Sequence, residues 1–164
     1  MTRIRKTIFL LVFALVAADQ LTKWLVETNL PFQEPVPVLP FFSLLRTYNT
    51  GIAFSMLSDF GNGGLIALTG IVLALIFWLW RNVTADQQLA HLGFALVVSG
   101  AIGNVIDRLT QGHVIDFLLL HTQNWAFAVF NLADAFITIG AIAIVIDEFF
   151  SPRRGGKAPT ASSS

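Results

Sequence analysis

The sequence predicts an integral membrane protein that is mainly α-helical, with four transmembrane helices, a small extracytoplasmic β-sheet element and both termini in the cytoplasm. The composition supports this class. Of the 164 residues, 55% are hydrophobic and 12% are charged, whereas soluble domains carry roughly 25% charged residues. The uneven placement of the basic residues, described below, supports the topology. The formal net charge of zero argues against nucleic acid as a partner, and the lack of cysteine excludes disulfides and cysteine metal sites.

The first predicted helix covers about residues 8–26 and follows a short basic segment. Such a start is also typical of a secretory signal peptide. The apolar run is too long for a typical signal-peptide core, and no clear A-x-A site follows it, so we interpret it as a retained transmembrane helix. Near its end, Asp19 and Lys23 are four residues apart and share a helix face. This spacing favours an ion pair that orients the helix over a direct role in catalysis.

Residues 27–63 are predicted to form a loop on the outer face. The prolines at positions 31, 35, 37 and 40 oppose helix and favour extended backbone. Residues 41–57 mix β-branched and aromatic residues around a turn signal at 49–51, which predicts short strands. We expect these strands to rest on the membrane surface, because an open sheet in hydrocarbon would leave its backbone edges unsatisfied. The segment 61–64, Gly-Asn-Gly-Gly, is predicted to be a loop.

Three further helices are predicted at about residues 65–80, 89–106 and 131–149. The first of these ends with two tryptophans that suit the membrane interface. The next contains small residues whose spacing allows close helix contact in lipid, which we favour over a ligand-binding role. These small residues are Gly93, Ser99, Gly100 and Gly103.

A second outer loop is predicted at residues 109–128, with extended segments at about 113–118 and 125–130. The polar tail at 151–164 is predicted to be flexible. Residues 1–150 therefore form the expected single membrane-embedded domain.

The basic residues set the predicted topology. Seven of the ten fall on one side of the four-helix arrangement, namely Arg3, Arg5, Lys6, Arg81, Arg153, Arg154 and Lys157. The other three are Lys23, Arg46 and Arg108. The positive-inside bias places both termini in the cytoplasm and both outer loops on the far side of the membrane.

Polar residues gather in one short region around the second outer loop: Asn104, Asp107, Arg108, His113, Asp116, Asn131 and Asp134. Ionisable residues in membrane segments are rare and mark a functional site by default. Asp116 in the loop and Asp134 in the first turn of the last helix are expected at the same membrane depth. Two carboxylates held close share one proton. The ionised one can take a proton from water while the protonated one polarises a peptide carbonyl, which predicts amide hydrolysis.

A purely structural interpretation of the same residues is also open. Asp134 could complement a helix N-terminus that Asn131 caps, and Asp116 could be a solvated loop carboxylate. Asp107 could pair with Lys23 or Arg108 as scaffold. Asn104, on an apolar helix, is expected to be a buried hydrogen-bonding group.

Other chemistries have weaker support in the sequence. A metal could be held by some of His113, Asp116, His121 and Asp134, but no compact ligand motif is present. A Ser–Lys mechanism would need a serine beside Lys23, and the serines at 43, 55 and 58 have no recognisable context. A proton-coupled transporter is the main rival class, followed by a lipid-binding scaffold. Transport favours carboxylates at the bilayer midplane and repeated halves, whereas these aspartates cluster toward one face and no repeat is visible.

Five blocks, in order and spread over residues 6–150, resemble bacterial signal peptidase II, the lipoprotein signal peptidase, an aspartic protease of the inner membrane. The blocks are Asp19-Gln-Leu-Thr-Lys23, Asn49-Thr-Gly51-Ile-Ala53-Phe54, Gly100-Ala-Ile-Gly103-Asn104-Val-Ile-Asp107-Arg108, Gly112-His-Val-Ile-Asp116-Phe117 and Phe130-Asn131-Leu-Ala133-Asp134. One departure is visible, because many members have proline shortly before the last block and this chain has Ala128-Val129.

The resemblance implies that Asp116 and Asp134 are the catalytic pair. It implies that the substrate pocket is lined or braced by Asn49, Asn104, Arg108 and Asn131. It implies structural support of the site from Asp19, Lys23, Gly51 and Asp107. The implied enzyme needs no metal or cofactor and is a monomer in the bacterial cytoplasmic (inner) membrane, with its active site toward the outer face.

The partners implied are membrane lipid and prolipoproteins that carry a diacylglyceryl group on the lipobox cysteine. Cleavage falls just before that cysteine and releases the signal peptide. Globomycin-type inhibitors are implied to occupy the same site.

Overall fold

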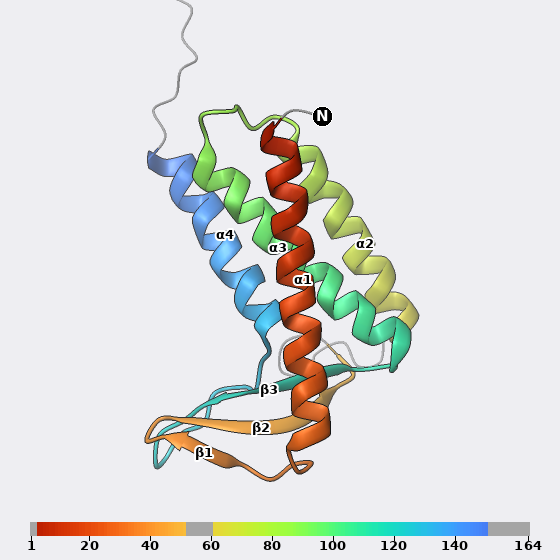
Figure 1. Ribbon diagram of the computed structural model, residues 1–164, viewed down its shortest axis with the longest axis vertical. Coiled ribbons are helices and arrows are strands. Elements are labelled where there is room, and N and C mark those ends of the chain that lie inside the picture. The colour runs from red at the N-terminus through yellow and green to blue at the C-terminus, as the bar shows by residue number, and fades with distance from the viewer. Residues whose placement is uncertain (1–2, 52–60, 151–164) are drawn as a thin grey trace, which may run out of the picture.

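The computed structural model describes residues 3–51 and 61–150 (Figure 1). Within these residues the elements are, in order, α1 (Arg3–Asn29), β1 (Val36–Leu39), β2 (Phe42–Asn49), α2 (Gly61–Trp80), α3 (Gln88–Thr110), β3 (Val114–Leu120) and α4 (Leu132–Phe150). The helices form a bundle and the sheet lies across one end of it, while the start of α1 and the end of α4 lie at the opposite end. The strands predicted beyond residue 51 and the predicted tail at 151–164 lie outside the described residues.

Three of the described helices are long and apolar enough to cross a membrane, namely residues Lys6–Asn29 of α1, α2 and α3. Large apolar side chains such as Phe13, Ile71 and Phe77 are exposed on the bundle. This exposure suits helices whose outer faces contact lipid rather than water. The prediction of a mainly helical membrane protein with a small sheet is confirmed at this level.

The helices α1, α2 and α3 are longer than the sequence predicted, while α4 has the predicted length. α1 extends past the predicted 8–26 at both ends. Its additional turns contain arginine, lysine and glutamate, whose helix propensities are similar to that of leucine. The segment 61–64, predicted to be a loop, instead forms the first turn of α2. Leu65 is almost fully buried and the Asn62 side chain donates a hydrogen bond to the Gly112 carbonyl. These tertiary contacts outweigh the low helix propensity of glycine.

The three described strands form an antiparallel sheet in the order β1-β2-β3. Val36 pairs with Leu44, and Asn49 pairs with Val114. A register shift lies between Leu44 and Thr47, after which Thr47 pairs with Asp116. Side chains alternate between the two faces of a strand. Asn49 is therefore a diagonal neighbour of Asp116 on the same face.

The extended segment predicted at 113–118 is confirmed as β3, whereas the one predicted at 125–130 is not a strand. It makes only isolated bridges, between Leu118 and Phe130 and between His121 and Ala126. The chain leaves the sheet at Phe130 and enters α4 at Leu132.

Glycine allows the close packing of α3 on α4. A β-carbon added at Gly93 would lie 2.7 Å from the Gly140 carbonyl oxygen, and one added at Gly140 would lie 2.6 Å from the Gly93 carbonyl oxygen. At Gly103 an added β-carbon would collide with the Asp19 carboxylate of α1. The predicted role of these small residues in helix contact is confirmed.

The variant Gly140→Ala is expected to lower the free energy of unfolding by about 1–3 kcal/mol, because its methyl group would overlap a backbone carbonyl. Gly70→Ala on α2 is the matched control, since nothing lies within 4 Å of its added β-carbon. Alanine favours helix over glycine by about 1 kcal/mol, so this control should not be destabilised. Thermal unfolding in detergent measures both, and equal melting temperatures would contradict the packing argument.

Candidate active site

The two aspartates singled out from the sequence lie where the sheet meets the helices. Asp116 is on β3 and its side chain is 2% exposed, while Asp134 is in the first turn of α4 and is partly buried. Both line one cavity of about 730 Å³. Most of its wall is apolar and comes from α2, α3, α4 and residues 127–130, and its other polar lining includes Asn49, Asn104 and Arg108.

Each carboxylate oxygen of the two aspartates accepts a hydrogen bond from an uncharged N–H group. The two oxygens of Asp116 accept from Asn131 Nδ2 at 2.7 Å and Asn49 Nδ2 at 2.9 Å. Those of Asp134 accept from Asn104 Nδ2 at 2.8 Å and from the Asn131 backbone N–H at 3.2 Å. Amide donors hold a carboxylate in position without neutralising its charge. The pair therefore stays able to bind a proton.

Asn131 joins the two aspartates. Its side-chain oxygen accepts from the Asp134 backbone N–H at 2.9 Å, while its own backbone N–H donates back to the Asp134 carboxylate. This reciprocal arrangement is that of a capping box at the start of α4. The same side chain also donates to Asp116, and Asn131 is fully buried. The capping role considered from the sequence is confirmed, and it coexists with a direct link between the aspartates.

The electrostatics of the cavity favour a shared proton. Burial, and after it the negative charge of Asp134, raise the pKa of the Asp116 carboxyl, which reaches about 7. Hydrogen bonds from Asn49 and Asn131, together with the charge of Lys23, act to lower this pKa. Near neutral pH the Asp116 carboxyl therefore exists in both its protonated and its ionised form.

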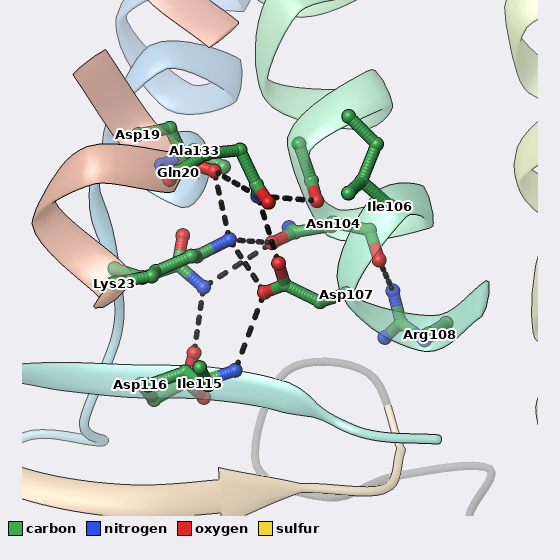
Figure 2. A network of polar contacts seen from close by, with 12 residues as sticks. Asp19, Gln20, Lys23, Asn104, Ile106, Asp107, Arg108, Ile115, Asp116 and Ala133 are labelled. Atoms are coloured by element: carbon green, nitrogen blue, oxygen red, sulfur yellow. Dashed lines mark hydrogen bonds and ion pairs between the residues drawn. The ribbon is translucent and has the colours of Figure 1, made fainter. Parts of the chain in front are cut away.

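Next to the aspartate pair lies a buried ionic cluster, shown in Figure 2, that joins α1 to α3. The Lys23 ammonium lies 2.9 Å from Asp19 Oδ2 and 2.7 Å from Asp107 Oδ2, and it donates to Asn104 Oδ1 at 3.1 Å. The side chains of Lys23, Asp19 and Asp107 are 2%, 0% and 1% exposed. The predicted Asp19–Lys23 ion pair is confirmed, as is the pairing of Asp107 with Lys23. Asn104 is confirmed as a buried hydrogen-bonding group.

Gln20 is a member of this cluster that the sequence reasoning missed. Its side-chain amide donates to Asp107 Oδ1 at 2.8 Å, and Asp19 Oδ2 and the Gly103 carbonyl both lie 3.2 Å from its nitrogen. An uncharged polar residue in a helix carries little signal by itself. The spacing of three residues to Lys23, which places both on one helix face, could have indicated it.

Arg108 connects α3 to the end of β2. Its guanidinium donates to the Gly51 carbonyl at 2.6 Å and to the Asn104 carbonyl at 3.4 Å, and the side chain is buried. The Gly51 backbone N–H in turn donates to the Asn49 side chain at 2.9 Å. The turn predicted at 49–51 is thus held against α3, and this fixes Asn49 beside Asp116.

The alternative chemistries gain no support from the geometry. Within residues 3–51 and 61–150, no three histidine or acidic side chains form a group that could hold a metal ion. The His121 ring is hydrogen-bonded to Ser43 at 2.8 Å, and the His113 ring stacks on Tyr48 with centroids 3.9 Å apart. Lys23 is engaged by Asp19, Asp107 and Asn104, and the serines at 55 and 58 lie outside the described residues.

Comparison with known proteins identifies the family. The family model for signal peptidase (SPase) II matches residues 11–150. A lipoprotein signal peptidase from Mesorhizobium japonicum is 53% identical over 145 residues, which is 88% of this chain and 86% of the relative. One from Sinorhizobium fredii is 50% identical over 147 residues, covering 90% and 89%. One from Brucella ovis is 49% identical over 148 residues, covering 90% and 92%.

Solved structures share the fold of this chain. Two structures of bacterial membrane enzymes are similar to this chain, with TM-scores of 0.81 and 0.76 at 27% and 28% identity. They cover 93% and 90% of this chain, and 93% and 95% of their own chains. The fold, with three described helices long and apolar enough to cross a membrane, is that of a bacterial membrane enzyme. The chain belongs to the signal peptidase II family.

The Asp116 carboxyl is expected to titrate near pH 7, and this midpoint should fall in Asp134→Asn because the neighbouring negative charge is removed. Infrared difference spectra recorded against pH measure the titration, with Asp116→Asn identifying the carboxyl band. A midpoint near pH 4, or one unchanged by Asp134→Asn, would contradict the electrostatic coupling of the two carboxylates.

Proposed function

We propose that this chain is a membrane aspartic endopeptidase that removes the signal peptide from diacylglyceryl-modified prolipoproteins, cleaving just before the lipidated cysteine. Membership of the lipoprotein signal peptidase family carries the general activity, cleavage of signal peptides from prolipoproteins. One observation supports the assignment of the catalytic residues. Two carboxylates line the same cavity, and every oxygen of both accepts a hydrogen bond from an uncharged donor. Asp116 and Asp134 are the proposed catalytic residues.

The proposed reaction is a direct attack of water on the peptide bond. The ionised aspartate takes a proton from water, and the hydroxyl oxygen bonds to the scissile carbonyl carbon while the other aspartate donates its proton to the carbonyl oxygen. The tetrahedral diol then collapses as the carbon–nitrogen bond breaks. The leaving nitrogen takes the proton that the base removed from water, and one diol hydroxyl returns its proton to the other aspartate. The products are a carboxyl group and an amine, and the pair again holds one proton. No metal, cofactor or covalent intermediate is required.

The capping geometry suggests how the two carboxylates divide these roles. Asp134 lies at the N-terminus of α4 and accepts a backbone N–H, and a helix N-terminus favours negative charge. Asp116 is more deeply buried and has a raised pKa. In the resting enzyme we therefore assign the proton to Asp116 and the role of base to Asp134.

The surrounding residues suit a peptide substrate. Asn49, Asn104, Arg108 and Asn131 are proposed to line or brace the pocket, and their contacts with the aspartate pair or with Gly51 support this. Asp19, Lys23, Gly51 and Asp107 are proposed to support the site from behind. The apolar cavity wall from α2 and α4 would suit the hydrophobic part of a signal peptide or a lipid chain.

The proposed location is the bacterial inner membrane, with α4 as a fourth span and residues 1–150 as one membrane-embedded domain. α4 has 19 residues, about 28 Å at 1.5 Å per residue, which is close to the thickness of a bilayer core. Both termini are proposed to be cytoplasmic and the site to face outward, where a lipid-anchored substrate can reach it by diffusion in the membrane plane. We propose that the enzyme acts as a monomer and that globomycin-type inhibitors occupy the same cavity.

Asp116→Asn and Asp134→Asn are expected to abolish cleavage, because each removes a proton acceptor or donor that the reaction needs. The loss should be on the order of 10²- to 10⁴-fold in kcat or greater. The measurement is a gel-shift assay of purified protein in detergent with a diacylglyceryl-modified prolipoprotein.

Asp147→Asn is the matched control. Asp147 is also buried and accepts a hydrogen bond from Gln87 at 2.9 Å, but it lies thirteen residues along α4 from Asp134, about 20 Å at 1.5 Å per residue. Its cleavage rate should equal that of the parent, and added chelator should not slow the parent. Cleavage by folded Asn variants at 116 or 134 would refute the assignment. If the folded parent never cleaves the substrate, the result would favour the proton-coupled transporter over the peptidase.

A further inference from the structure

Two threonines line the cavity that holds the aspartate pair. They are Thr69 on α2 and Thr138 on α4. The other lining residues that the structure describes on these two helices are apolar, except for Asp134. A hydroxyl in apolar surroundings costs free energy unless it is hydrogen-bonded. The hydrogen-bond partner of each hydroxyl therefore decides whether that hydroxyl is available to a bound molecule.

The Thr69 hydroxyl is satisfied within its own helix. It donates to the Leu65 carbonyl, four residues earlier, at 2.8 Å. Such contacts with a carbonyl three or four residues earlier are common for serine and threonine in helices. The same contact is made by the hydroxyls of Thr22, Thr28, Ser99 and Thr110. The donor of Thr69 is therefore not available to a ligand.

The Thr138 hydroxyl differs from these. Within residues 3–51 and 61–150 it has no hydrogen-bond partner, although the Asp134 carbonyl lies four residues earlier in the same helix. The Thr138 side chain is exposed, and it lines the cavity. Its donor is thus free at the wall of the cavity, where a bound molecule can accept from it.

Thr138 lies one helical turn from Asp134. The spacing of four residues places both side chains on one face of α4, and both line the cavity. This spacing corresponds to about 6 Å along the helix axis at 1.5 Å per residue. α4 runs from the sheet toward the opposite end of the bundle (Figure 1). Thr138 is therefore on the side of Asp134 that faces away from the sheet, which is the membrane side in the proposed orientation.

We propose that Thr138 is a substrate-binding residue, whose hydroxyl donates a hydrogen bond to a carbonyl oxygen of the bound prolipoprotein close to the scissile bond. This inference rests on the proposed function and deepens it. The signal peptide precedes the scissile bond and lies on the membrane side of it. An extended chain rises about 3.3 Å per residue, so a carbonyl about two residues before the scissile bond would lie level with Thr138.

The substrate presents carbonyl groups that need such a donor. A peptide carbonyl within a helix is paired with a backbone N–H, so the chain around the scissile bond must leave the helical conformation before water can attack it. Its carbonyls then lose their helical partners, and an unpaired carbonyl in an apolar cavity costs free energy. The ester carbonyls of the diacylglyceryl group are a second source of the same acceptor.

Three variants separate binding from structure. Thr138→Val removes the hydroxyl and keeps the branched shape, whereas Thr138→Ser keeps the hydroxyl. Neither should lower the melting temperature, because the Thr138 hydroxyl has no partner among the described residues. Thr28→Val is the matched control, since Thr28 is also an exposed helical threonine but does not line the cavity.

The first experiment measures kcat, KM and the melting temperature of the parent and these variants with the diacylglyceryl-modified prolipoprotein. Thr138→Val should lower kcat/KM on the order of 10-fold, because it leaves one substrate carbonyl in the cavity unpaired. Most of this loss should be in KM, since the hydrogen bond forms away from the reacting atoms and is present before and in the transition state. Thr138→Ser and Thr28→Val should stay within about twofold of the parent, because the first keeps the donor and the second is outside the cavity.

The second experiment identifies the acceptor with substrate analogues. One set replaces, one at a time, each peptide bond within three residues before the scissile bond by an alkene isostere that lacks the carbonyl. Another analogue carries a dialkyl ether lipid in place of the diacyl ester. The parent and Thr138→Val are compared on each analogue as a double-mutant cycle. On the analogue that lacks the true acceptor, the two enzymes should have equal kcat/KM.

Four results would overturn the assignment of Thr138. They are an unchanged kcat/KM in Thr138→Val, a loss that Thr138→Ser shares, a loss accompanied by a lower melting temperature, and a loss that persists in full on every analogue. These results differ from failure of the proposed function, in which folded Asp116→Asn or Asp134→Asn would still cleave or the folded parent would not.

Discussion

One buried ammonium group organises this protein. Lys23 lies between two carboxylates in a region where uncompensated charge is very costly, and the three side chains are nearly inaccessible to solvent. Each carboxylate has oxygen lone pairs left over after binding Lys23. Asp19 uses one for the start of α4 and Asp107 uses one for β3. The requirement to satisfy every buried polar group therefore joins α1, α3, α4 and the sheet at a single point.

Asn131 extends this organisation to the aspartate pair. A cap residue is normally explained by the helix it begins, and Asn131 does cap α4. Its remaining amide group binds Asp116 and lies 3.2 Å from the Asn104 side-chain oxygen. Helix initiation and the placement of the pair thus depend on the same side chain. A structural and a functional interpretation of such a residue are not alternatives.

Much of the fold could be predicted from the sequence because long apolar runs and prolines are strong local signals. The four helices and the strand at 113–118 follow from them, and the acidic pair follows from charges placed in an apolar chain. The start of α2 at Gly61 and the isolated bridges of residues 125–130 could not be predicted, because contacts between distant segments decide both. The partners of Gln20 could not be predicted either, because they include Gly103 and Asp107, more than eighty positions away, and only its spacing from Lys23 indicated the face it shares.

The surroundings of the aspartates suit a reaction that needs one proton shared by two carboxylates. If a lysine or arginine paired directly with either one, both would ionise and no acid would remain. The basic residues instead bind other groups. Lys23 pairs with Asp19 and Asp107, and Arg108 donates hydrogen bonds to backbone carbonyls. The amides of Asn49, Asn104 and Asn131 fix the geometry at no cost in charge. Lys23 and Arg108 thus support Asp116 and Asp134 through other residues and do not bind them directly. Burial meanwhile raises the pKa of Asp116, so that this carboxyl can hold a proton near neutral pH.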